Sequence, residues 1–226
     1  MSLDPQQYLK SFHVAPALGL VYVNNPKVAC STIKLSLQRA ELGDQGHEPR
    51  PSVHSHEGSP LLTWPDLTPA RLERERAGKL LFSFVRNPFD RLRSAYLNKI
   101  ARPRKHSRPR EQAGFDPDHR PGFAEFVESL DGRDPAGFNP HWRPQVLNLS
   151  VDRLQFDFIG RLERFDADWA SLETRVGQAL PISRAGKRTG RDVSHPAEYD
   201  MRLTRIVARV YAADFARFGY SDASAP

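Results

Sequence analysis

The sequence predicts a three-layer α/β/α fold in which helices cover both faces of a mainly parallel β-sheet. Two observations predict it. Short apolar runs that suit buried strands recur along the 226 residues, and segments with helical spacing follow several of them. In folds of this kind, ligands bind at the carboxyl ends of the strands. We expect residues 1–18 to form an N-terminal arm with one short helix, and residues 19–226 to form a single domain.

The charge balance favours an anionic partner. Lysine and arginine total 33 against 27 acidic residues, which gives a net charge of +6. Nucleic acid, an acidic membrane surface, small polyanions and acidic glycans would all suit such a chain. The single cysteine excludes an intrachain disulfide, and no apolar run approaches the ~20 residues that cross a bilayer. The first residues also lack the pattern of a signal peptide, so we expect a cytoplasmic setting, with a trimmed lumenal domain as the alternative.

The first element of the predicted domain is a strand, tight turn and helix within GLVYVNNPKVACSTIK, Gly19 to Lys34. The strand covers Leu20–Val23, and apolar residues then recur at helical spacing. Successive N–H groups at such a helix start, with a lysine and hydroxyl side chains beside them, can cradle a phosphate-like anion. The turn has none of the glycines of GxxxxGK[ST], so it is not a Walker A loop.

The segment from Leu42 to Leu67 is predicted to be a loop, and it contains the pair His54 and His56. A zinc site would need further ligands, and the only cysteine, Cys30, lies inside the anion loop. Two alternatives stay open: solvated loop histidines, or a base that takes a proton from a hydroxyl group, for which imidazole is suited near neutral pH. A helix with a charged face should follow over Leu67–Ala77.

The second informative stretch is KLLFSFVRNPFDRLRSAYLNKI, in which Leu80–Val85 predicts a buried strand. Asn87 and Pro88 then predict a helix start, as N-cap and first residue. Arg86 and Ser94 are placed to converge on one phosphate. Two anion sites of this kind suggest a ligand with phosphates at both ends. The expected core stripe of the helix is Phe89, Leu92, Tyr96 and Ile100, and the opposite side is Asn87, Arg91, Ser94 and Asn98.

The two stretches resemble the Golgi carbohydrate sulfotransferases of the chondroitin and dermatan 4-O-sulfotransferase type. PKVACSTIK is similar to their 5′-phosphosulfate loop, and FSFVRNPFDRLRSAY is similar to their 3′-phosphate motif. Further matches follow in the same order: FAEFVESL, FNPHWRPQ, FDFIGRLERFDADW and KRTGR. The resemblance runs from about Gly19 to Tyr220. Ser31-Thr32-Ile33 stands where these relatives commonly carry Thr-Asn-Trp.

The resemblance implies a P-loop-NTPase-like sulfotransferase fold. It also implies 3′-phosphoadenosine-5′-phosphosulfate (PAPS) as donor, adenosine 3′,5′-bisphosphate (PAP) as product, and no metal. His56 aligns with the family's upstream histidine and is the expected base, with His54 as the fallback and His141 as a weaker third candidate. The residues expected to hold PAPS are Lys27, Val28, Ala29, Cys30, Ser31, Thr32, Arg86, Ser94, Lys187 and Arg188. The residues expected to line the acceptor cleft are His141, Trp142 and Arg143.

The remaining segments fit this organisation. Residues 101–121 form a Pro- and Arg-rich insert, read either as a solvated loop or as a collector of anions. A short amphipathic helix is expected over Phe123–Leu130, a buried strand over Phe156–Gly160, and a helix from Asp166. A last helix should open at Pro196. Its expected core residues are Leu203, Ile206, Val207, Val210, Tyr211, Phe215 and Phe218.

The sequence therefore predicts an enzyme that moves a sulfuryl group from PAPS to a hydroxyl group of a carbohydrate-like acceptor. An acidic saccharide or a glycolipid would suit the basic loops. Three alternatives stay open: a P-loop-like kinase that needs Mg²⁺, a basic nucleic-acid-binding module, and a nucleotide sensor without catalysis. Nucleic acid is disfavoured because the basic insert has few of the aromatic residues on which bases stack.

Overall fold

The computed structural model describes residues 5–101, 108–184 and 199–222. The chain divides into two compact units. Unit 1 comprises Met1–Val85 and Val151–Gly186, and unit 2 comprises Arg86–Ser150 and Lys187–Pro226. The predicted single domain over residues 19–226 stays a prediction.

Unit 1 is built on a four-stranded sheet in the order β1-β2-β3-β4. Its strands are β1 (Phe12–Ala15), β2 (Leu20–Val23), β3 (Leu80–Val85) and β4 (Phe158–Arg161). The pairs β2–β3 and β3–β4 are parallel, and β1 pairs antiparallel with β2. The predicted mainly parallel sheet is confirmed. The carboxyl ends of β2, β3 and β4 therefore meet at one edge, where α/β folds bind ligands.

β1 corrects the prediction of an arm with little pattern. The short helix α1 (Pro5–Leu9) is present, but residues 12–15 then form a strand whose four residues are all buried. One side of β1 pairs with β2. On its other side, Val14 exchanges two backbone hydrogen bonds of 2.9 Å with Leu62, so the strand is covered at both edges.

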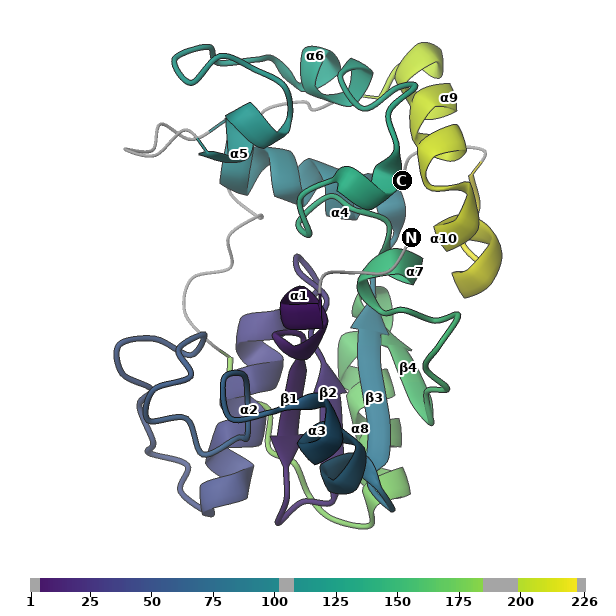
Figure 1. The fold of residues 1–226 in the computed structure, drawn as a ribbon. Coiled ribbons are helices and arrows are strands. Elements are labelled where there is room, and N and C mark those ends of the chain that lie inside the picture. The colour runs from purple at the N-terminus through teal and green to yellow at the C-terminus, as the bar shows by residue number, and fades with distance from the viewer. Residues whose placement is uncertain (1–4, 102–107, 185–198, 223–226) are drawn as a thin grey trace. The chain divides into compact units, whose positions relative to one another are not determined.

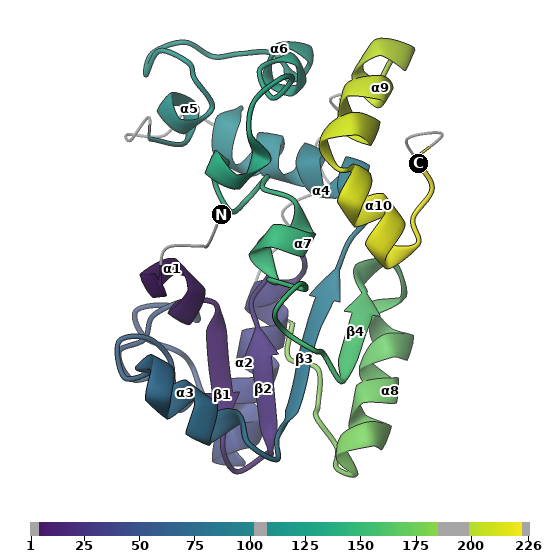
Figure 2. The same cartoon turned by 45° about the vertical axis from the view of Figure 1, so that its right-hand side comes forward.

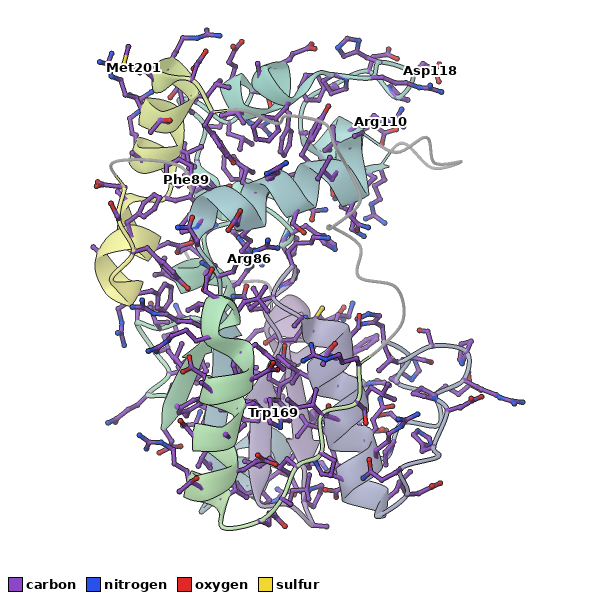
Figure 3. All side chains as sticks on the ribbon, turned by 180° about the vertical axis from the view of Figure 1, so that it is seen from behind. Arg86, Phe89, Arg110, Asp118, Trp169 and Met201 are labelled. Carbon is purple, nitrogen blue, oxygen red and sulfur yellow. The ribbon has the colours of Figure 1, made fainter. Side chains whose placement is uncertain are left out.

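Helices cover both faces of this sheet, which gives unit 1 its three layers. The helices α2 (Cys30–Leu42) and α8 (Phe165–Val176) lie on one face, and α3 (Pro69–Arg76) lies on the other (Figures 1 and 2). A short 3-10 turn, η3 (Leu162–Arg164), leads from β4 into α8. Figure 3 views the face covered by α2 and α8 and labels Trp169. This residue packs with Phe84 and Phe165 in the hydrophobic core of the unit.

Two of the helix-start signals in the sequence are confirmed. Thr68 caps α3 by accepting a hydrogen bond of 3.2 Å from the N–H of Arg71. Asn87 caps α4 (Pro88–Ala95) by accepting one of 2.9 Å from the N–H of Phe89. Both helices carry a proline in their first turn, where its missing N–H costs nothing.

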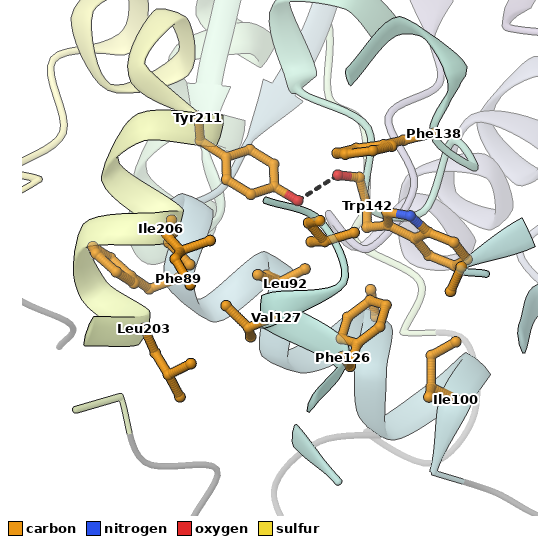
Figure 4. Packing of buried hydrophobic residues seen from close by; sticks show 14 of the residues in the cluster. Phe89, Leu92, Ile100, Phe126, Val127, Phe138, Trp142, Leu203, Ile206 and Tyr211 are labelled. Carbon is orange, nitrogen blue, oxygen red and sulfur yellow. Dashed lines mark hydrogen bonds between the residues drawn. The ribbon is translucent and has the colours of Figure 1, made fainter. Parts of the chain in front are cut away.

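Unit 2 is helical in its described residues. Its elements are α4, the π-helical turn η1 (Tyr96–Ile100), α5 (Arg108–Gln112), α6 (Phe123–Glu128), the 3-10 turn η2 (Pro135–Gly137), α7 (Gln145–Asn148), α9 (Met201–Val210) and α10 (Ala212–Phe218). Figure 4 shows its core, where α4, α6 and α9 meet around Phe89 and Phe126. In the same view, the Tyr211 hydroxyl donates a hydrogen bond to the backbone oxygen of Trp142.

Tyr96 packs against this core as predicted and is half-buried. Other predictions in unit 2 need correction. Arg91, expected on the side of α4 away from the core, is 1 % exposed. Arg110, expected in a solvated insert, is also buried and donates a hydrogen bond of 2.7 Å to the backbone oxygen of Pro117. The last helix begins at Met201 after the N-cap Asp200 and breaks at Tyr211, while the predicted start at Pro196 lies outside the described residues.

In the part of the chain that the structure describes, no helix is long and apolar enough to cross a membrane.

Candidate functional site

The loop between β2 and α2 has the backbone of an anion-binding turn. Lys27 and Ala29 adopt left-handed conformations, with φ of 71° and 51°. Ala29 is the N-cap of α2 and has no side chain that could accept from the first N–H groups of the helix. Because these N–H groups carry the positive end of the helix dipole, they favour an anion at this point. The 13-residue α2 thus begins as an anion-binding helix should.

Side chains around this loop fit a doubly charged ligand. Lys27 lies in the turn, and Ser31 and Thr32 bring hydroxyl groups to the first turn of α2. Val28 is buried, so the loop is anchored in the core. Asn25 is buried as well, and its side-chain amide donates a hydrogen bond of 3.1 Å to the backbone oxygen of Phe84 near the end of β3. The donor set of a lysine, hydroxyls and backbone N–H groups suits a phosphosulfate.

His54 is the histidine that reaches this loop. Its Nε2 lies 2.9 Å from the Ser31 hydroxyl, and its Nδ1 lies 3.4 Å from the Lys34 amine. The ring of His56 instead meets Trp64 edge to face, with 6.3 Å between ring centroids. Both imidazoles are exposed. The family resemblance favoured His56 over His54, whereas in the structure it is His54 that lies beside the predicted anion loop.

A pocket of about 270 Å³ opens beside His54 in unit 1. Its lining includes Lys10, His13, Lys34, His54, His56 and Trp64. Lys34 is only 6 % exposed, and burial lowers its pKa to about 8. Burial also holds the pKa of His13 well below its usual value, and the charge of Lys34 lowers it further. At pH 7 the pocket therefore holds a neutral His13 beside a Lys34 that loses its proton more readily than an exposed lysine would.

The sequence did not identify Lys34 and His13 as residues of the site. Lys34 had a usable signal, since it follows Ser31 by three residues on a predicted helix and must share its face. His13 had none, because its position depends on β1.

The second predicted anion site lies in unit 2 and starts at Arg86, labelled in Figure 3. Gln145 holds the backbone of this arginine at two points. Its side-chain oxygen accepts a hydrogen bond of 3.0 Å from the Arg86 N–H, and its amide nitrogen donates one of 2.8 Å to the Arg86 carbonyl. Asp214 in turn accepts from the N–H groups of Gln145 and Val146 at 2.8 and 2.9 Å.

Gln145 and Asp214, which hold the backbone of Arg86 in this way, are both fully buried. Burial raises the pKa of Asp214, and the hydrogen bonds from Gln145 and Val146 oppose that rise. Ser94, the partner expected for Arg86, lies half-buried on α4.

The segment predicted to line an acceptor cleft is largely structural. Trp142 is fully buried in the core of unit 2 and meets Phe126 edge to face. Arg143 is also buried and donates a hydrogen bond of 2.8 Å to the Asn148 side chain. Trp142 is therefore a core residue, which corrects its expected place in a cleft. His141 is half-buried with its Nδ1 2.7 Å from the Asn139 side-chain oxygen, and its role stays a prediction.

Buried Arg91 explains how that segment is held. Its guanidinium donates hydrogen bonds of 2.8 and 2.9 Å to the backbone oxygens of Arg143 and Pro140. Arg91 thus fixes the 140–143 backbone and is not available to a ligand through these two donors.

The predicted phosphate contacts Lys187 and Arg188 lie outside the described residues. Across the described ranges, no group of three or more histidine, cysteine, aspartate or glutamate side chains is arranged to hold a metal ion.

Comparison with known proteins identifies a family and several relatives of this chain. Residues 10–221 match the model of the "Sulfotransferase family". Carbohydrate sulfotransferase 14 of Mus musculus is 28% identical over 231 residues, covering 94% of this chain and 60% of its own length. Carbohydrate sulfotransferase 12 of Mus musculus is 28% identical over 258 residues, with 96% and 61% covered. Carbohydrate sulfotransferase 11 of Rattus norvegicus is 24% identical over 229 residues, with 89% and 64% covered.

The chain thus spans about three fifths of the length of the first of these relatives. No solved structure matches the chain significantly.

Proposed function

Because this chain belongs to the sulfotransferase family, we propose that it transfers a sulfuryl group from PAPS to a hydroxyl group of a carbohydrate acceptor. One observation supports the proposal above the others. The uncapped start of α2, with Lys27 in the turn before it, lies next to an imidazole that contacts Ser31 of the same loop. Such a transfer needs a group that binds the anionic donor and a base that takes the acceptor proton.

The anion loop would hold the reacting end of PAPS, which supplies the sulfuryl group. In a transfer of this type, the acceptor oxygen forms a bond to sulfur while the bond between sulfur and the phosphate oxygen breaks, and its electron pair stays on that oxygen. In this proposal, Lys27 and the N–H groups of residues 30–32 would stabilise this growing negative charge. No protein group needs to form a covalent intermediate.

His54 is the base in this proposal, and His56 is the alternative. Nε2 of His54 lies 2.9 Å from Ser31, whose hydroxyl belongs to the helix turn that would face the sulfuryl group. A base must lie within hydrogen-bonding reach of the proton that it removes, and an acceptor hydroxyl bound beside Ser31 would lie near this nitrogen. The acceptor proton would then pass to His54 Nε2.

Arg86 and Ser94 would bind the 3′-phosphate of PAPS. The support is chemical and local: a guanidinium pairs with phosphate through two parallel hydrogen bonds, and Gln145 fixes the backbone of Arg86. Lys187 and Arg188 belong to the same proposal as further phosphate contacts, on the strength of the family resemblance.

The acceptor class rests on the relatives, which are named carbohydrate sulfotransferases. The net charge of +6 favours an anionic acceptor, so an acidic saccharide or a glycolipid is the first to test. The compartment in which the protein acts stays a prediction.

The experiment combines calorimetry with a turnover assay. We expect PAP to bind with measurable heat and to raise the melting temperature, and labelled PAPS to modify a saccharide hydroxyl in the presence of EDTA. Lys27→Ala should lower turnover about a hundredfold with little change in PAP affinity, because it removes one charge-stabilising donor. Lys79→Ala, which changes a lysine paired with Glu75 on the same unit, is the matched control and should keep full turnover.

Absence of any PAP binding would refute the proposal, and full turnover in Lys27→Ala would refute the role of that lysine.

A further inference from the structure

His54 has a hydrogen-bonding partner at each ring nitrogen. Nε2 lies 2.9 Å from the hydroxyl of Ser31, and Nδ1 lies 3.4 Å from the amine of Lys34. We propose that Lys34 is a positioning residue that decides which nitrogen of His54 carries the proton, and thereby whether His54 can act as a base. This inference rests on the proposed role of His54 in sulfuryl transfer.

The reasoning follows from the donors and acceptors of the two side chains. A charged lysine has three N–H donors and no acceptor. While Lys34 is charged, Nδ1 of His54 must accept from it, so the imidazole proton sits on Nε2 and points at Ser31. Nε2 then has no lone pair for an acceptor proton. A neutral Lys34 can instead accept from Nδ1–H, which leaves the Nε2 lone pair facing Ser31 and the anion loop.

The surroundings of Lys34 let its amine lose the proton at a pH near 8. The side chain is 6 % exposed, and burial lowers its pKa to about 8. Cys30, one turn earlier on α2, opposes this shift. The titratable groups that share the pocket with Lys34 are His13 on β1, Lys10 after α1, and His54 and His56 on the loop.

His13 stays neutral near pH 7, because burial holds its pKa well below the usual value. Its Nδ1 lies 2.6 Å from the Phe12 carbonyl, which can only accept, so this nitrogen carries the proton. His13 therefore adds no positive charge next to Lys34 over this range.

The proton balance of the proposed step follows directly. The O–H bond of the acceptor breaks, its electron pair forms the bond to sulfur, and its proton goes to Nε2 of His54. The proton already on Nδ1 can then move across the hydrogen bond to the neutral amine of Lys34. The pair ends with one proton more than it began, and turnover requires Lys34 to start without charge.

The pH dependence of kcat/KM tests this coupling in the full chain. The wild-type value should rise with pH through about 8, the pKa of Lys34. Lys34→Met removes the coupled amine, so the midpoint of the rise should leave pH 8 and move to lower pH. Lys34→Arg keeps a cation that does not lose its proton, and kcat/KM at pH 9 should fall at least about tenfold with no alkaline rise.

Lys79→Met is the matched control and should keep the wild-type profile, since this lysine pairs with Glu75 away from the pocket. A Lys34→Met profile that rises at the same pH as the wild type would overturn the inference. A merely structural lysine would change the height of the profile without moving its midpoint.

A second measurement needs neither turnover nor a Lys34 variant. Nitrogen-15 NMR of the wild-type protein, with His54 assigned by comparison with His54→Gln, reports which ring nitrogen is protonated. We expect Nε2–H at pH 7 and Nδ1–H at pH 9.5. The same tautomer at both values would overturn the inference whatever the activity. A tautomer switch without any turnover of PAPS would leave the inference standing and refute the proposed function.

Discussion

Burial of Lys34 should make the protein less stable at neutral pH than a variant with an apolar side chain there. Burial lowers the pKa of this lysine from 10.5 to about 8. A difference of one unit between the pKa in the folded state and the pKa in the unfolded state corresponds to about 1.4 kcal/mol. Charging the buried amine therefore costs about 3 kcal/mol of folding free energy.

The sign of the pH dependence follows from proton counts. Between pH 8 and 10.5, the unfolded chain holds the lysine proton and the folded chain does not. The free energy of unfolding therefore rises with pH through this range, and the whole cost is present below pH 8. Methionine has a similar volume and no charge, so Lys34→Met removes the cost. It also removes the contact with His54, worth about 1 kcal/mol.

Urea unfolding of the two proteins at pH 7 and pH 10.5 measures the balance. We expect Lys34→Met to be more stable than the wild type by about 2 kcal/mol at pH 7, and slightly less stable at pH 10.5. Taking differences at each pH cancels the titration of all other groups. The matched control is Lys79→Met, whose lysine is partly exposed beside Glu75 and should change stability by less than about 0.5 kcal/mol at both pH values.

A loss of stability of equal size at both pH values would refute the reasoning, because it would show that the buried amine carries no charging cost. A gain in stability accompanied by a displaced pH profile would show that Lys34 serves the reaction at the expense of the fold.

Two further variants test the supports of the site and of the sheet. Gln145→Leu removes both hydrogen bonds to the Arg86 backbone and should weaken PAP binding about tenfold by calorimetry, whereas Gln178→Leu, which loses one bond to a backbone carbonyl, should leave that affinity unchanged. Equal losses in both would contradict a specific role. Gly160→Ala would place a Cβ 2.3 Å from the Phe84 ring and should cost about 3 kcal/mol by urea unfolding. Adding Phe84→Leu should cost less than the sum of the two single changes, and strict additivity would argue against the clash.

The elements that could be predicted are those whose signals are local. The strands Leu20–Val23 and Leu80–Val85 are bounded by turn residues, and α3 and α4 begin with side-chain caps and prolines. β1 had no such signal. Its burial comes from pairing with β2 on one side and with the segment at Leu62 on the other, which no local pattern reports.

The residues of the candidate site also differ in whether a local sequence signal could identify them. The strand, turn and helix of the proposed anion loop could be predicted because they lie in one short stretch that includes Lys27 and Ser31. The contact of Lys34 with His54 spans 20 residues, and the contact of Arg86 with Gln145 spans 59, so periodicity could not find either.

The prediction for Arg91 was wrong for a different reason. A stripe of apolar residues predicts that one side of a helix is buried. In α4 the side with Arg91 is buried as well, against the backbone carbonyls of Pro140 and Arg143. A buried arginine satisfied by carbonyl oxygens looks, in sequence, like a solvated one.

One helix connects the two halves of the proposed chemistry in unit 1. Ser31, Lys34 and Gln38 follow one another at spacings of three and four residues, so they share a face of α2. Ser31 belongs to the turn that would bind the sulfuryl donor, and Lys34 contacts the proposed base. Gln38 donates a hydrogen bond of 3.4 Å to the backbone oxygen of Val53, next to that base. An in-line transfer is fast only when donor and base keep a fixed geometry. Because α2 carries the contacts to both, a substitution at Gln38 should disturb the placement of His54 while leaving the anion loop intact.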